Sequence, residues 1–466
     1  MSRRMGTTFA ALRQRDYRIW TGAGFVSVTG TWMQVLGINW YVLDRTGSAT
    51  QVGFAVLLQA LPVLLLSSWG GALADRLPAR RLLIASQLAH ATLAAALAVI
   101  AWTSGGLALV YAISFAGGVI SAVEGPIMGR FNALLVERET LGNALALGSL
   151  VSSSGRILGM SAGGLLVAVA GTAPLFAINA VSFIAVVGAL LAVHARRAAV
   201  PEPSGGGNGV RAGFRYLLRQ PAVLTALALS FVLGSLGRNY QVTMAAMSNG
   251  PLATGAAGYG ALSTVFAVGT VIGGFAAARR GRLGYRTLVG AGLMASVLQM
   301  VAGLAPGVWT FGALILPIAA GAIVIDTTVS ARVQLDTRED MRGRVLAALA
   351  MTSSVATAAG APLLGWLAEH AGARQTLVLA GTAAAIAAVA AGVALARLHG
   401  HHVRCLAVVS RTYPAGRAPV PAGVLGTRTV RRDRECAACV PRHGRPRRRS
   451  AAAAKRRAAV AGSPTP

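Results

Sequence analysis

Cysteine, lysine and acidic residues are all scarce in this chain of 466 residues. Its three cysteines, Cys405, Cys436 and Cys439, all lie near the C-terminal end. The long preceding part can therefore have neither a disulfide framework nor a cysteine metal site. Charged residues make up only 12% of the chain against 55% hydrophobic residues, which excludes an ordinary soluble globular protein. The sequence has no G-x-x-x-x-G-K-[ST] phosphate-binding loop, which disfavours a pump driven by ATP.

The basic residues are unevenly placed. All 43 are arginines except Lys455, and residues 397–466 carry +14 of the formal net charge of +29. This tail is rich in Arg, Pro, Ala and Gly, so we expect it to be disordered. Its Cys436-Ala-Ala-Cys439 pair lacks a second pair at zinc spacing, and we predict no metal site. The charge would attract anionic lipid headgroups, and we expect no specific nucleic-acid partner. The abrupt change in composition also fits a shifted reading frame.

Long apolar runs dominate the rest of the chain. A helix needs about 20 apolar residues to cross a bilayer, and windows of that length predict an all-α polytopic membrane protein with twelve transmembrane helices. The predicted spans are 19–43, 51–74, 82–102, 106–128, 142–170, 173–194, 221–247, 256–278, 286–305, 308–331, 344–368 and 373–396.

The arginines predict the topology of these spans. The N-terminus and the even-numbered connections carry 23 arginines, whereas the other side has only Arg45 and Arg374. Such an asymmetry places the arginine-rich side in the cytoplasm. We therefore expect a multi-pass protein of the inner or plasma membrane with both termini cytoplasmic.

The sequence also predicts two similar halves. Glu124 stands six residues before Arg130, as Asp326 stands six before Arg332, and a repeat of this kind is typical of transporters with a site between two halves. The predicted organisation is a cytoplasmic N-terminus (1–18), a first six-helix half (19–194), a cytoplasmic linker (195–220), a second six-helix half (221–396) and the basic tail (397–466).

The short connection GGALADRLPARR carries the charges of a known signature. It resembles the loop between spans 2 and 3 of the major facilitator superfamily, G-x-x-x-D-R-x-G-R-R, although its Leu77-Pro78-Ala79 spacer is one residue longer and lacks the glycine. The resemblance implies a gating or conformational role for these residues and for the charge at the end of span 4, which are Gly71, Asp75, Arg76, Arg80, Arg81 and Arg130.

Longer stretches resemble one branch of that superfamily. FAALRQRDYRIWTGAGFVSVTGTWMQ, GRFNALLVERETLGNALALGSL and ARVQLDTREDMRGRVLAAL are similar to the branch of enterobactin exporters, macrolide efflux proteins and transmembrane secretion effectors. The resemblance implies the major facilitator fold with a central cavity lined by spans 1, 4, 7 and 10. Candidates at or near that cavity are Gln34, Asn39, Glu124, Arg238, Asn239, Gln241 and Asp326.

Ionisable groups inside spans are functional candidates. Glu124 and Asp326 could accept protons, or they could form fixed ion pairs that brace the inner gate. Arg156 lies near the middle of span 5, where a guanidinium needs a partner, and Glu124 is the partner we predict. His90 is interpreted as a packing residue of span 3.

Span 5 contains closely spaced glycines. Gly155, Gly159, Gly163 and Gly164 let helices approach closely. They also resemble the antiporter signature G-x-x-x-G-P-x-x-G-G of superfamily exporters, with Met160 in place of the proline.

The leading hypothesis is a secondary transporter, not an enzyme, that exports a small lipophilic molecule such as a drug, siderophore or secondary metabolite in exchange for protons. An uptake permease of the same superfamily is one alternative, and a membrane scaffold acting through its basic tail is another. We expect no cofactor, a monomer, and the substrate, protons and the lipid bilayer as partners.

Overall fold

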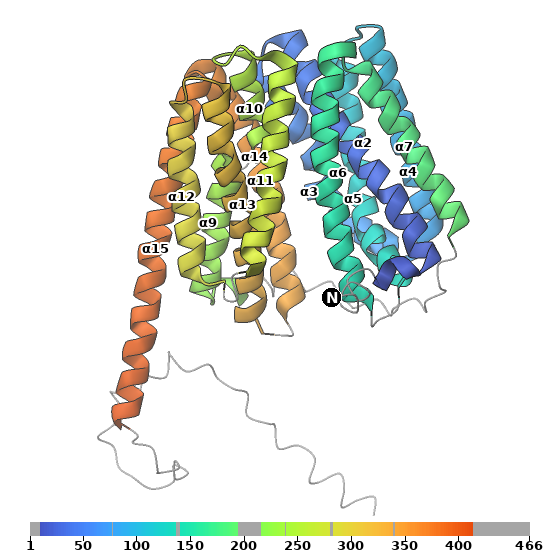
Figure 1. Cartoon of the computed structure of the whole chain (residues 1–466). Helices are drawn as coiled ribbons and strands as arrows, with labels where there is room; N and C mark the ends of the chain where they lie inside the picture. Colours follow the sequence, from blue (N-terminus) through green and yellow to red (C-terminus); the bar gives the residue numbers. More distant parts are fainter. Residues whose placement is uncertain are drawn as a thin grey trace, which may run out of the picture. The chain divides into compact units, whose positions relative to one another are not determined.

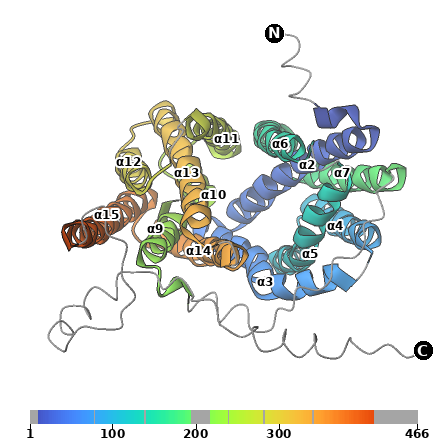
Figure 2. The same cartoon turned by 90° about the horizontal axis from the view of Figure 1, so that it is seen from below.

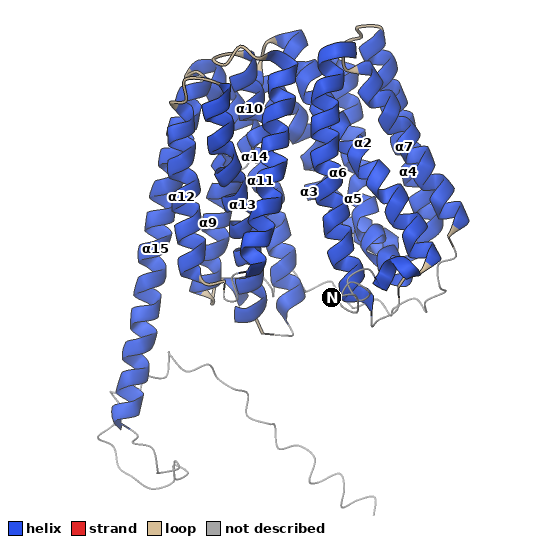
Figure 3. Cartoon of the chain, viewed as in Figure 1, coloured by secondary structure: helices blue, strands red, loops and turns tan. Residues whose placement is uncertain are grey.

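The computed structural model describes residues 10–76, 78–136, 140–193, 216–237, 239–279, 283–338 and 341–412. In these ranges the chain forms helices and no strand (Figures 1 and 3). Met1–Leu395 form one compact unit. The elements before the linker are η1 (Ala10–Arg13), α2 (Arg15–Thr46), α3 (Ala49–Arg76), α4 (Ala79–Trp102), α5 (Leu107–Leu134), α6 (Leu141–Ala170) and α7 (Ala173–Ala192). Those after it are α9 (Pro221–Gly237), α10 (Tyr240–Asn249), α11 (Gly255–Arg279), α12 (Tyr285–Gly303), α13 (Val308–Asp336), α14 (Arg342–His370) and α15 (Ala373–Thr412).

The predicted all-α membrane fold is confirmed. Eleven helical segments of the described chain, with α9 and α10 counted together, are long and apolar enough to cross a membrane. The predicted first span lies in α2, which falls below that apolar threshold. The reason is local, because α2 carries hydroxyl and amide side chains such as Ser27, Thr31 and Gln34 that line a cavity.

The predicted seventh span is divided. α9 ends at Gly237 and α10 begins at Tyr240, with Asn239 between them. The Asn239 amide nitrogen donates to the carbonyl oxygens of Ser235 at 3.0 Å and Gly234 at 3.4 Å. These bonds satisfy carbonyls that the end of a helix leaves open, so a break inside the membrane is tolerated.

The last helix differs from the expected boundary. α15 continues to Thr412, so residues 397–412 of the predicted disordered tail are helical. This stretch contains no proline, and its three arginines and two leucines favour helix. Residues beyond 412, with Cys436 and Cys439, lie outside the described ranges, as do residues 194–215, which include most of the predicted linker of 195–220.

The bundle has two groups of helices, which we call the N-terminal half (α2–α7) and the C-terminal half (α9–α15, to Leu395). In the first, α2 packs on α6 and α7 while α5 packs on α3 and α4; in the second, α13 packs on α11 and α12 while α14 packs on α9. The halves meet along two helix pairs, α3 with α14 and α6 with α11 (Figure 2). We call this boundary the seam.

The apolar core shows where the halves are joined. One cluster contains residues of both halves, among them Val42, Val52, Tyr259 and Ala361. The other large clusters each stay in one half, around Phe131 in the first and around Leu288 in the second. The shared cluster lies at the end of the bundle that contains the α2–α3 connection at Gly47, which we call the closed end.

Close backbone approaches and a carboxylate also join the halves near the closed end. A Cβ on Gly164 would lie 2.3 Å from the Cα of Gly260, so α6 and α11 can approach this closely only with glycine at both positions. Glu369 of α14 accepts hydrogen bonds from the hydroxyls of Ser48 and Thr50 and, at 3.1 Å, from the Thr50 backbone nitrogen. The acid thus caps the start of α3 from the opposite half.

Candidate functional site

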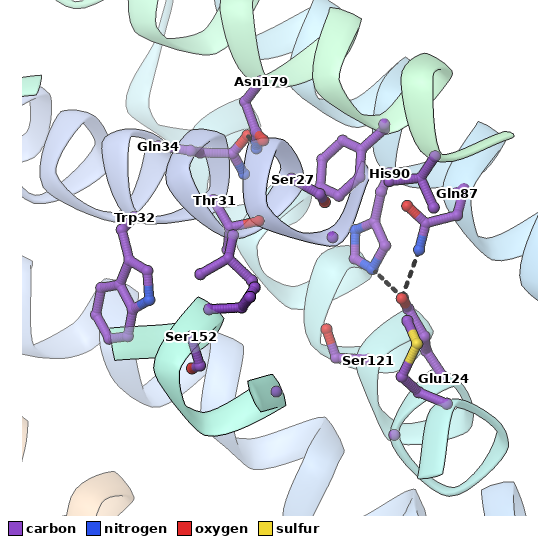
Figure 4. A pocket seen from close by; sticks show the side chains of 18 of the residues that line it. Ser27, Thr31, Trp32, Gln34, Gln87, His90, Ser121, Glu124, Ser152 and Asn179 are labelled. Atoms are coloured by element: carbon purple, nitrogen blue, oxygen red, sulfur yellow. Dashed lines mark hydrogen bonds and ion pairs between the residues drawn. The ribbon is translucent and has the colours of Figure 1, made fainter. Parts of the chain in front are cut away.

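The N-terminal half contains a partly open cavity of about 900 Å³, which we call the N-terminal cavity. Helices α2 to α7 all contribute to its walls, and Figure 4 shows part of the lining. Glu124 is the only acid and His90 the only histidine among the described residues that line it, and they include no arginine or lysine. Hydroxyl, amide and aromatic side chains make up much of the rest, including Trp20, Ser27, Thr31, Trp32, Gln34, Gln59, Ser121, Ser149, Ser152, Asn179 and Phe183.

Glu124 has two partners in this cavity. Its Oε1 accepts a hydrogen bond from the Gln87 amide at 2.5 Å, and its Oε2 lies 3.1 Å from Nε2 of His90 (Figure 4). The side chains of His90 and Glu124 are each only 15% exposed. The carboxylate is therefore held by an amide and an imidazole, and the imidazole can itself take or release a proton.

The helices explain why these three residues meet. Gln87 and His90 are three residues apart in α4, so both lie on the same face, and α4 packs on α5, which carries Glu124. The His90 ring also stacks on Phe183 of α7, with ring centroids 5.2 Å apart. The interpretation of His90 as packing therefore misses its contact with Glu124. The available signal was the Gln87 and His90 pair at helical spacing in an otherwise apolar span.

An amide pair forms another part of the lining. The Asn179 amide of α7 donates to the Gln34 carbonyl oxygen of α2 at 2.8 Å, and Asn179 Oδ1 accepts from Ser182 at 2.9 Å. The structure thus places Gln34 in the N-terminal cavity, as one of its lining residues. Amides held in place in this way can fix the orientation of a bound molecule without adding charge to the cavity.

The end of the cavity away from the closed end is bordered by aromatic residues. The Trp20 indole donates to Asn132 at 2.6 Å, and its ring meets Phe131 edge-on with centroids 5.0 Å apart. Tyr17, just before the predicted first span, donates its hydroxyl to the Ala144 carbonyl at 2.8 Å. Burial raises the pKa of the Tyr17 phenol above its ordinary value, so this hydroxyl remains a donor.

A smaller cavity of about 250 Å³ lies at the seam, and we call it the seam cavity. Arg156 and Trp32 line it from the N-terminal half, and Gln241 and Asp326 line it from the C-terminal half. The predicted pairing of Arg156 with Glu124 is wrong. Arg156 instead donates to the Thr270 hydroxyl and lies over the Trp32 ring, 5.5 Å from its centroid, because it is directed from α6 toward α11 of the other half.

The other cavity candidates lie in different places. Asn39 bridges the halves, with its amide 3.4 Å from Oε1 of Gln241 and 3.2 Å from the hydroxyl of Tyr259. Asn239 is buried and caps α9 instead of lining either cavity. Arg238 lies outside the described residues.

The gating candidates are only partly visible. Arg80 donates to the carbonyl of Leu191 at 2.8 Å, which ties the start of α4 to the end of α7, and Arg81 is exposed. The surroundings of the remaining candidates lie outside the described part, namely those of Gly71, Asp75, Arg76 and Arg130. Their gating role remains a prediction.

The glycines of α6 lie at close helix contacts. A Cβ would lie 2.8 Å from the Val28 side chain at Gly155, 2.4 Å from the Thr29 carbonyl oxygen at Gly159 and 3.4 Å from Met33 at Gly163. These three face α2, whereas Gly164 faces Gly260 of α11. Small residues at these positions let α6 pack on both halves at once.

The sequence and the architecture match known transporters. The transmembrane secretion effector family matches residues 6–412. The staphyloferrin A transporter of Staphylococcus aureus (strain NCTC 8325 / PS 47) is 23% identical over 252 residues, and the match covers 54% of this chain and 64% of that relative. The chain thus matches less than two thirds of the relative's length.

Solved structures agree in fold. A bacterial homolog of the human lysosomal transporter Spinster, in an inward-facing and unoccupied conformation, has a TM-score of 0.65 at 14% identity, covering 82% of this chain and 96% of that chain. The nucleoside transporter NupG has a TM-score of 0.66 at 12% identity, covering 82% and 99%. The match across residues 6–412 shows that the chain belongs to the transmembrane secretion effector family of the major facilitator superfamily, as a multi-pass membrane transporter and not an enzyme.

Proposed function

We propose that the protein is a proton-coupled exporter of a small lipophilic molecule, which binds in the N-terminal cavity and is released by alternating access. The observation that carries this proposal is the pairing of Glu124 with Gln87 and His90 on the wall of a cavity whose described lining contains no other acid. A single acid in that position can link the occupancy of the cavity to the uptake and release of a proton.

The cavity suits a molecule that is mostly apolar. A volume of about 900 Å³ falls in the range that holds drug-sized ligands. Trp20, Trp32 and Phe183 offer flat apolar surfaces, while hydroxyls and amides supply a few oriented hydrogen bonds. A siderophore is one candidate, since the relative in Staphylococcus aureus is a staphyloferrin A transporter.

Proton coupling follows from the chemistry of the Glu124 cluster. A charged carboxylate inside a membrane protein is stabilised by the Gln87 amide and by His90 when the imidazole is protonated. Once Glu124 is protonated it carries no charge for these partners to stabilise, and its hydroxyl can donate a hydrogen bond to His90 or to a bound molecule. Proton binding would thus change both the charge and the hydrogen bonding of the cavity wall, which is what exchange with a substrate requires.

Alternating access would use the contacts at the closed end. The arginine distribution predicts that α2 begins in the cytoplasm, so the closed end would face outward and the N-terminal cavity would be loaded from inside. Outward opening would then need α6 to separate from α11 and Glu369 to release the start of α3. The protein would act as a monomer in the inner or plasma membrane, with its termini in the cytoplasm.

Accumulation in cells tests the proposal. Cells expressing the full chain receive a panel of lipophilic antibiotics, dyes and siderophores, with and without a protonophore, beside cells expressing Glu124→Gln or the exposed control Arg279→Gln. We expect at least one compound to be excluded by the wild type and by Arg279→Gln, and the exclusion to be lost with the protonophore and with Glu124→Gln. Faster entry of a compound would show import instead, and exclusion that survives Glu124→Gln would contradict the coupling site.

A further inference from the structure

Arg156 is a charged group inside the bundle, and its contacts with the described residues include no acid. In the described chain its guanidinium bonds to the Thr270 hydroxyl and lies over the Trp32 ring. Both partners are neutral. A guanidinium has five N–H donors, so most of its donors are unused in this arrangement.

A half-buried cation of this kind is unfavourable unless an anion compensates its charge. Asp326 lines the same cavity from α13, but it has a partner of its own and forms no ion pair with Arg156. The cation-π contact with Trp32 stabilises the guanidinium less than a paired carboxylate would. Arg156 therefore brings a positive charge to the wall of a space of about 250 Å³, which Asp326 also lines.

Other polar groups border the same space. The Gln241 side chain lines the seam cavity, and so does Ser263, whose hydroxyl is buried. Amide N–H and hydroxyl donors beside an arginine form the kind of group that binds a carboxylate, with the planar guanidinium as the bidentate partner.

Trp32 connects this space to the N-terminal cavity. Its ring lines both cavities, and the Arg156 guanidinium lies on it. A molecule that spans both cavities would place its apolar body in the N-terminal cavity and an acidic group beyond Trp32 in the seam cavity.

We propose that Arg156 is the anchor for a carboxylate of the transported molecule, so that the substrates are lipophilic organic acids. The inference rests on the proposed function, because it specifies the chemistry of the molecule transported. It also links binding to movement. Arg156 belongs to α6 and Thr270 to α11, so a carboxylate that takes the guanidinium from Thr270 weakens one contact across the seam as it binds.

Three probes with the same aromatic body and different charge test this assignment. Binding of 2-naphthoate, 2-naphthamide and 2-naphthylmethylammonium to the purified full-length protein is measured by isothermal titration calorimetry at fixed pH. We expect the carboxylate to bind about tenfold or more tightly than the amide, as one bond between charged partners supplies, and the ammonium to bind most weakly.

Variants then assign that preference to Arg156. Arg156→Gln should remove the preference for the carboxylate and Arg156→Lys should keep part of it, while the exposed control Arg279→Gln should keep all of it. Size-exclusion elution and retained binding of the amide identify variants that are folded. A wild type without a preference for the carboxylate, or a folded Arg156→Gln protein that keeps it, overturns the proposal.

The test is independent of the proposed transport. It uses no gradient and no membrane, so loss of the carboxylate preference leaves proton-coupled export standing. Absence of export in cells, conversely, leaves the binding result standing.

Discussion

The two halves of the bundle are built from similar helices but differ in what lies between them. In the N-terminal half, α4 and α5 bring Gln87, His90 and Glu124 together on the wall of a large cavity. In the C-terminal half, the corresponding α12 packs into an apolar cluster with α9, α13 and α15.

The internal repeat makes the contrast specific. The spacing that relates Glu124 to Asp326 also relates Gln87 to Val289 and His90 to Gly292. Val289 packs against the apolar cluster, and a Cβ on Gly292 would lie 3.0 Å from the Leu233 side chain. The fold can thus be built with apolar residues at both positions, so the polar cluster of the N-terminal half serves something other than folding.

The largest effect should separate the two related acids. Glu124→Gln should abolish transport driven by a pH gradient in proteoliposomes, because the uncharged amide cannot take up or release the proton. Asp326→Asn should keep the gradient dependence, since Asp326 lines only the seam cavity. Transport by each variant is measured with a compound found in the accumulation assay. Equal loss of gradient dependence in both would show that the halves share the coupling.

Added volume should affect the halves in opposite ways. Gly117 lines the N-terminal cavity, and a Cβ there meets nothing within 4 Å, whereas Gly292 faces Leu233. Gly292→Leu should lower the free energy of unfolding by about 1–3 kcal/mol through overpacking, while Gly117→Leu should leave stability almost unchanged and slow the transport of bulky compounds. Thermal unfolding in detergent and transport rates measure the two effects. Equal destabilisation would mean that the N-terminal cavity closes in the folded protein.

Weakening the contact between the halves at the closed end should have a smaller effect, which is seen in how often that end opens. Glu369→Gln removes the negative charge that accepts hydrogen bonds from Ser48 and Thr50. These groups are exposed, so the contact between the halves should lose about 0.5–1 kcal/mol of stability. Ala49 is buried beneath α14, and a cysteine introduced by Ala49→Cys should be labelled by a thiol reagent about two to five times faster in the Glu369→Gln variant. Arg45→Gln is the control, because Arg45 bonds to Ser104 within one half. Unchanged labelling would remove Glu369 from the gate.

Removal of residues 413–466 should have the smallest effect on transport. Transport should be unchanged, because both cavities are lined by residues before the tail. The measurement is transport per molecule of purified protein in proteoliposomes, with and without residues 413–466. A large loss would favour the alternative in which the basic tail carries the function.

Much of the fold can be predicted from the sequence, because a segment that crosses a bilayer must be apolar, long enough, and helical. Apolar length predicts the spans, and the match of residues 6–412 to the family agrees with the resemblance of the loop near Asp75. The division between α9 and α10 was not predicted, because the Asn239 cap depends on where its side chain turns. The composition of the whole tail predicts disorder from residue 397, but its prolines all lie beyond Thr412, and the stretch before them continues α15.

The site was harder to predict than the spans. Glu124, Gln34 and Arg156 could be singled out because polar groups are rare in spans. The partners of these residues depend on which face each helix turns toward its neighbours, and a single sequence does not show this. Arg156 is directed toward Thr270 and not toward Glu124 because α6 presents that face to α11, and His90 meets Glu124 because α4 packs on α5.

Protection of single cysteines tests the central claim most directly. Ser152 lines the N-terminal cavity, and Ser354 occupies the related position in α14. Each is changed to cysteine in protein whose three natural cysteines are replaced by serine, and maleimide labelling is measured with and without a transported compound. The account predicts that the compound slows labelling of Ser152→Cys and leaves Ser354→Cys unaffected. Equal protection of both, or protection of Ser354→Cys alone, would contradict a substrate site in the N-terminal half.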